Sequence, residues 1–76
     1  MSYEGTVQIG SRVRVREVDG DMEFTLVSPE DADLATKQFS AASPMGRALM
    51  GRRPGDEVRF HTPGGTVSIT LMAIWS

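Results

Sequence analysis

The chain has no cysteine and only one histidine, His61, among its 76 residues. Disulfides and thiolate ligands are therefore excluded, and a transition-metal site would lack the side chains that it needs. No apolar run approaches the ~18 residues of a membrane-spanning helix. The first residues have neither the basic start nor the apolar stretch of a signal peptide. These absences predict a cytoplasmic protein with no metal, no cofactor and no membrane partner.

A strong excess of charge is also absent, because eight basic and ten acidic residues give a net charge of -2. Binding to nucleic acid rests on local positive charge, so we expect no independent nucleic-acid binding and a protein as the partner. The length predicts a single domain, residues 1–76, which we expect to be a monomer. Six bases are arginines in two groups: Arg12, Arg14, Arg16 and Arg47, Arg52, Arg53.

The first half of the chain contains apolar and polar residues in alternation. Within residues 6–18, Val13 and Val15 alternate with arginines, which predicts a half-buried strand. A Gly-containing turn follows, and a second strand is indicated by Met22, Phe24 and Leu26. Residues 30–38 have no clear period, so they predict an irregular loop with at most one helical turn. A short strand is expected at residues 39–41.

Residues 43–51 carry the signals of a short helix. Ser43 is a typical N-cap residue, and Pro44 suits the first helical position. Gly51 is placed to end the helix in a left-handed conformation. Because two turns of helix are unstable alone in water, this helix must pack on a sheet. Its apolar face consists of Met45, Ala48 and Leu49.

The remaining residues predict two strands around a tight hairpin at residues 62–65. Val58 and Phe60 alternate with charged residues in the first strand, and the second strand carries Val67, Ile69 and Leu71. The apolar phase then moves to Met72 and Ile74, which predicts a β-bulge. The expected fold is α+β, an antiparallel sheet of four to five strands packed on one short helix. Its core is expected to include Phe24, Phe60 and Trp75.

Most candidate reactive groups have a structural explanation. The acidic cluster Glu30, Asp31 and Asp33 lacks the glycine of a cation-binding loop, so it predicts a solvated loop. His61 is expected to face solvent without a nucleophile beside it. The glycines within residues 51–55 and 64–65 lack the Lys and Ser/Thr of a phosphate-binding loop. We therefore expect no catalytic residue.

Two groups of residues can each be interpreted in two ways. Arg12, Arg14 and Arg16 would lie on one strand face, either as a secondary contact with a partner or as a solvated face paired with acids such as Glu23. Ser43, Pro44 and Met45 are explained by a helix start. A flexible methionine beside a loop is, however, also typical of surfaces that bind partners.

The segment Ser43–Gly51, followed by Gly55-Asp56 and by Thr62-Pro63-Gly64-Gly65, resembles the C-terminal domain of the bacterial transcript-cleavage factors GreA and GreB. That domain carries S-P-[IM]-[AG]-R-[GA]-L-[IL]-G-K, then G-D and T-P-G-G, in the same order and spacing. The resemblance covers about residues 7–75. It implies an FKBP-like fold and docking on RNA polymerase at the rim of the secondary channel. The contact residues that it implies are Ala42, Ser43, Pro44, Met45 and Arg47.

Two departures from the family pattern bear on function. The family's N-terminal coiled coil, whose acidic tip helps to place Mg²⁺ for transcript cleavage, has no counterpart in these residues, so no catalysis is expected. Ala42 stands where the family usually has Asp or Asn. A stand-alone Gre-like regulator, of the nucleoside diphosphate kinase regulator type, is the alternative. A prolyl isomerase would need an aromatic-lined pocket, for which this chain has few aromatic residues.

Overall fold

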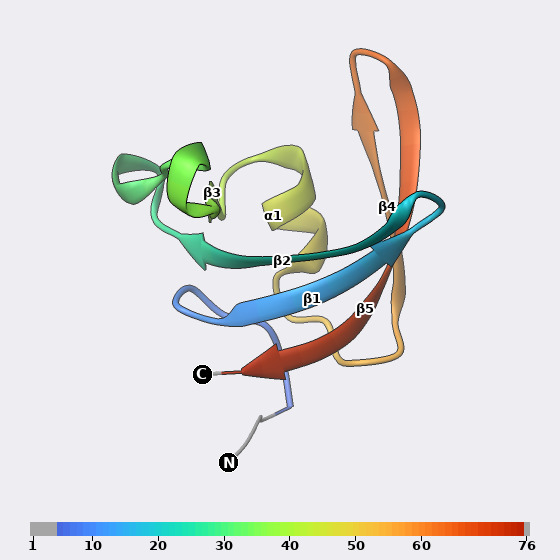
Figure 1. Cartoon of the computed structure of the whole chain (residues 1–76), viewed down its shortest axis with the longest axis horizontal. Coiled ribbons are helices and arrows are strands. Elements are labelled where there is room, and N and C mark those ends of the chain that lie inside the picture. Colours follow the sequence, from blue (N-terminus) through green and yellow to red (C-terminus); the bar gives the residue numbers. More distant parts are fainter. Residues whose placement is uncertain (1–4, 76) are drawn as a thin grey trace.

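The computed structural model describes residues 5–75, which form five strands, two 3-10 helices and a short α-helix. The strands make a curled sheet with the order β3-β2-β1-β5-β4, and α1 lies on its concave side (Figure 1). The predicted α+β class is therefore confirmed. The elements are β1 (Arg12–Glu17), β2 (Gly20–Val27), η1 (Pro29–Asp31), η2 (Leu34–Thr36), β3 (Gln38–Ser40), α1 (Pro44–Leu49), β4 (Glu57–Thr62) and β5 (Gly65–Trp75).

The expectation that the chain has no signal peptide rests on its first residues, and residues 1–4 lie outside the described residues. In residues 5–75, no helix has both the length and the apolar character that a membrane crossing requires.

One sheet edge differs from the expectation, because β3 runs parallel to β2, with Thr25 opposite Gln38 and Leu26 opposite Phe39. The prediction of a wholly antiparallel sheet is wrong here. A parallel pair needs a connection that carries the chain back along the first strand. Residues 28–37 provide it, and they contain two 3-10 helices where at most one helical turn was predicted.

The core lies between the concave face of the sheet and α1. Val13 and Val15 of β1 are fully buried, as is Leu49 of α1. Phe24 is also fully buried and stacks on Phe39, with ring centroids 4.6 Å apart. The remaining buried apolar residues are Val7, Leu26, Val58, Ile69, Leu71 and Ile74.

The aromatic residues near the two later strands are less buried than expected. Phe60 packs at the margin of the core, and Trp75 is 38% exposed. The prediction of a core Trp75 is therefore wrong. Its neighbour Ile74 is buried opposite Val13, so Trp75 takes the outer face opposite Arg12.

The predicted β-bulge is present in β5. Ala73 pairs with Arg14 and Leu71 pairs with Val15, so Met72 is the extra residue. Met72 is exposed, although the apolar pattern predicted that it would share the inward phase of Ile74. A bulge bends and twists its strand, and in Figure 1 the β4–β5 hairpin extends away from β1 and β2.

Candidate partner-binding surface

The start of α1 is fixed by Ser43. Its Oγ accepts a hydrogen bond from the backbone N–H of Gly46 at 3.0 Å and donates one to the Ser40 carbonyl at 2.7 Å. Pro44 occupies the first turn, where its missing N–H removes no helical hydrogen bond. The predicted N-cap is confirmed, and this same side chain ties the helix to the end of β3.

Gly46 brings α1 into direct contact with the backbone that precedes it. A Cβ at this position would lie 2.8 Å from the Cα and 3.0 Å from the carbonyl carbon of Ala41, and against the Ser40 oxygen. Only glycine fits such an approach without movement. The sequence analysis missed this role. The signal was a glycine inside a short helix, where it costs roughly 1 kcal/mol relative to alanine.

The structure brings the five predicted contact residues together on one stretch, residues 42–47, which we call the helix-start segment. Ala42, Pro44 and Arg47 are exposed, whereas Ser43 and Met45 are half-buried. Met45 packs against the margin of the core with part of its side chain and presents the rest to solvent. Ser43 is therefore chiefly structural, and the other four form the accessible surface.

The end of α1 is also fixed by hydrogen bonds. The predicted left-handed Gly51 is confirmed, with φ at 81°. Its N–H donates to the Val7 carbonyl, and the Val7 N–H donates to the Arg52 carbonyl, both at 2.9 Å. The Arg52 Nε donates to the Ala48 carbonyl at 3.3 Å, which satisfies one of the free helix carbonyls. The exposed arginines before and after Gly51 therefore belong to a backbone segment that hydrogen bonds hold in place.

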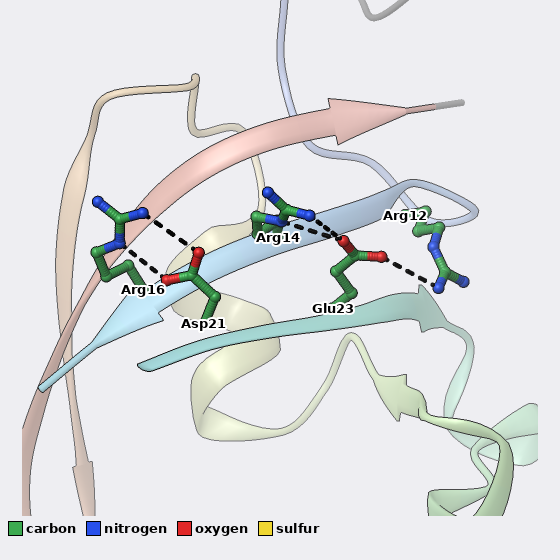
Figure 2. Close-up of polar contacts among 5 residues, drawn as sticks. All are labelled: Arg12, Arg14, Arg16, Asp21 and Glu23. Atoms are coloured by element: carbon green, nitrogen blue, oxygen red, sulfur yellow. Dashed lines mark hydrogen bonds and ion pairs between the residues drawn. The ribbon is translucent and has the colours of Figure 1, made fainter. Parts of the chain in front are cut away.

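The β1 arginine row, Arg12, Arg14 and Arg16, lies on the opposite face of the sheet from α1, because it alternates with the buried valines. Glu23 lies between two of these arginines, 3.3 Å from Arg12 Nη2 and 2.7 Å from Arg14 Nη2 (Figure 2). Asp21 accepts from Arg16 Nε at 2.8 Å and from its Nη2 at 3.3 Å. The structure therefore does not bring the row together with the helix-start segment.

The same pairs set the electrostatics of that face. The hydrogen bond from Arg14 lowers the pKa of Glu23, with a further contribution from Arg12. The hydrogen bond from Arg16 lowers the pKa of Asp21. The predicted pairing with Glu23 is confirmed, and the positive charge of the row is largely neutralised where it stands.

The remaining candidate groups take structural roles. His61 is exposed on β4, and its Nδ1 lies 3.1 Å from the hydroxyl of Thr66 on the facing strand. Asp33 caps η2 by accepting from the Ala35 N–H at 3.0 Å. Across residues 5–75, no three His, Cys, Asp or Glu side chains gather closely enough to hold a metal ion.

A curled five-stranded sheet around one short, capped helix defines this chain as a small α+β domain. The family model "Transcription elongation factor, GreA/GreB, C-term" matches residues 2–76. The chain belongs to the GreA/GreB family through this domain.

Individual relatives agree with the family assignment. The chain is 42% identical over 71 residues to the transcription elongation factor GreA of Roseiflexus castenholzii, which covers 90% of the chain and 45% of that protein. It is 42% identical over 67 residues to GreA of Thermotoga neapolitana, covering 84% of the chain and 43% of that protein. The chain thus spans a little under half the length of these curated relatives.

Solved structures show the same fold. Gfh1 of Thermus aquaticus matches with a TM-score of 0.83 and 32% identity, over 95% of the chain and 50% of that protein. The elongation factor GreA/GreB of Nitrosomonas europaea matches with a TM-score of 0.75 and 31% identity, over 95% of the chain and 62% of that protein.

Proposed function

We propose that this chain is the RNA-polymerase-docking domain of a Gre-type transcription elongation factor. It contacts the polymerase near the secondary channel through the helix-start segment and has no catalysis of its own. Membership of the GreA/GreB family supports the partner, and the residues at the start of α1 support the location. A stand-alone Gre-like regulator would use the same domain and the same surface.

The observation that carries the proposal is the combination of exposure and rigidity in residues 42–47. Pro44 and Arg47 are exposed, while the backbone between them is fixed by the Ser43 cap and by the Gly46 contact with Ala41. A surface that is already ordered loses little conformational entropy when it binds. Met45 adds a polarisable side chain that adapts to a partner.

The absence of catalysis is part of the proposal. His61 is exposed and bonded to Thr66, and the hydroxyl of Ser43 is engaged by Ser40 and Gly46. Neither group is paired as a nucleophile with a base. The chain should therefore bind polymerase without stimulating transcript cleavage, and it should leave the isomerisation of a model prolyl peptide at the background rate.

A binding measurement with purified RNA polymerase tests the proposal. Fluorescence anisotropy of the labelled chain is expected to show saturable binding, weakened about fivefold or more by Met45→Ala or Pro44→Ala. Met72→Ala is the matched control, because Met72 is an exposed methionine on β5, outside residues 42–53. Circular dichroism shows that each variant remains folded.

The result of the binding measurement distinguishes between no docking on polymerase and docking through another surface. No binding of the wild-type chain at micromolar concentration would show that this domain does not dock on polymerase. Binding that responds no more to Met45→Ala and Pro44→Ala than to Met72→Ala would place the contact outside the helix-start segment.

A further inference from the structure

Six of the seven arginines of the chain form two groups that differ in their ion pairs, and the seventh, Arg59, lies apart from both on β4. The three arginines of the β1 row are each bonded to Asp21 or Glu23 (Figure 2). Among residues 5–75, no carboxylate forms an ion pair with Arg47, Arg52 or Arg53, which we call the helix-end arginines. All three are exposed. Their charge is available to a partner, whereas that of the row is already used within the domain.

The charge along the chain is also strongly uneven. Residues 39–55 contain the three helix-end arginines and no acid, a balance of +3. The rest of the chain has five bases and ten acids, a balance of -5. Residues 5–16 also carry three arginines and no acid, but these arginines are paired with Asp21 and Glu23. The positive stretch of residues 39–55 includes the whole helix-start segment, so unpaired positive charge coincides with the proposed docking surface.

The helix-end arginines are carried by an ordered backbone. The Arg52 guanidinium bonds to the Ala48 carbonyl, which places it against the helical turn that contains Arg47. The Arg52 N–H donates to the Leu49 carbonyl, and the Arg53 N–H donates to Asp56 Oδ2, both at 2.9 Å. Asp56, the nearest acid after this stretch, thus has one oxygen engaged by the backbone. Fixed, unpaired charges at the rim of a contact steer association and select a partner of opposite charge.

We propose that the helix-end arginines form the electrostatic half of the docking surface, and that they contact an acidic protein surface beside the site that receives Pro44 and Met45. This inference rests on the proposed function. It reassigns the secondary contact from the β1 row to Arg47, Arg52 and Arg53. A protein partner is favoured over nucleic acid because the domain as a whole is acidic, which repels a phosphate backbone.

Charge reversal with a matched control tests the inference. Arg47→Glu and Arg53→Glu are compared with Arg59→Glu, which reverses one exposed arginine on β4, outside the positive stretch. At low ionic strength each helix-end reversal is expected to weaken polymerase binding about fivefold, whereas Arg59→Glu stays within about twofold of wild type. The difference is expected to shrink at high ionic strength, because exposed charges are screened. Equal urea midpoints exclude unfolding as the cause.

Failure of the inference is distinct from failure of the proposed function. If Met45→Ala weakens binding but Arg47→Glu and Arg53→Glu bind like the control, the docking site stands and the electrostatic contact is overturned. If the wild-type chain does not bind polymerase, both proposals fall. If the wild-type chain binds a duplex DNA or single-stranded RNA probe at the same concentrations, and the helix-end reversals abolish that binding, nucleic acid replaces the acidic protein as the partner.

Discussion

Gly46 is the residue whose replacement tests the seating of α1 most directly. In an open helix, alanine would be more stable than glycine by roughly 1 kcal/mol. Here the added methyl group would meet the Ser40 carbonyl and the Ala41 backbone. Backbone atoms cannot move aside without disturbing β3, so we expect Gly46→Ala to lower the free energy of unfolding by about 2 kcal/mol or more. Urea denaturation followed by circular dichroism measures the change.

The control for this substitution is Gly64→Ala in the β4–β5 turn. A Cβ there would find only the Thr62 hydroxyl, at an ordinary 3.8 Å, and Gly64 has no positive φ. Its free energy of unfolding is expected to change by less than about 0.5 kcal/mol. If Gly46→Ala is equally mild, α1 does not approach the backbone of Ser40 and Ala41 as closely as described.

Lys37 holds a conformation that suits a different residue. It follows η2 with φ 57° and ψ 45°, in the left-handed region, and its carbonyl accepts from the Thr25 N–H. This conformation costs a residue with a Cβ roughly 1 kcal/mol, and asparagine adopts it more readily than most other residues. Lys37→Asn is expected to raise the free energy of unfolding by roughly 0.5 kcal/mol, measured by thermal melting. An equal gain from Lys37→Ala would trace the effect to the lost charge instead of the backbone.

Two carboxyl groups of the β1–β2 hairpin make the stability depend on pH. The pKa values of Asp21 and Glu23 are lowered in the folded state by their arginine partners. A carboxyl group with a lowered folded pKa stabilises the fold above its unfolded pKa, and this contribution is lost as pH falls through the folded pKa. The unfolding midpoint should therefore drop on acidification below about pH 4, where unfolded carboxyl groups titrate.

Nuclear magnetic resonance titration of the side-chain carboxyl carbons measures the effect at each site. Arg16→Gln is expected to return the Asp21 pKa toward its ordinary value and to leave that of Glu23 lowered, because Arg14 and Arg12 act on Glu23. An Asp21 titration that ignores this substitution would contradict the assignment of the pair.

The elements that sequence patterns identified are those with local causes. The alternation around Val13, the Ser43-Pro44 cap and the phase slip after Leu71 each depend on near neighbours, and each is present in the structure. The parallel pairing of β3 was not predictable, because it depends on where residues 28–37 carry the chain. The close approach at Gly46 was hidden for the same reason, since the atoms that exclude a Cβ belong to the preceding strand end.

The candidate surface was predictable in part. The residues of the helix-start segment followed from the family resemblance, but their division into a structural Ser43 and accessible neighbours required the hydrogen bonds. The two arginine groups were visible in the sequence. Only the structure distinguishes the group that is paired with carboxylates from the group that is not.

The two halves of β5 give the domain unequal local stability. Residues 70–75 pair with β1, which is itself paired with β2, while residues 65–69 pair with β4 alone. A two-stranded ribbon is marginal in water. We expect hydrogen-bonded amides near the β4–β5 turn, such as those around His61 and Thr66, to exchange roughly 100-fold faster than those between β1 and β5. Uniform protection along β5 would contradict this division.

Because Met72 is the extra residue of the bulge, we expect β5 to tolerate the deletion of this one residue. Leu71, Ala73 and Ile74 already lie opposite Val15, Arg14 and Val13, so deleting the Met72 codon would leave a regular ladder with every buried side chain still inward. Deleting Ser68 would instead exchange the inward and outward faces of the residues before it. A single-codon deletion scan should therefore find one tolerated site within this strand, and the folded product should have a flatter sheet.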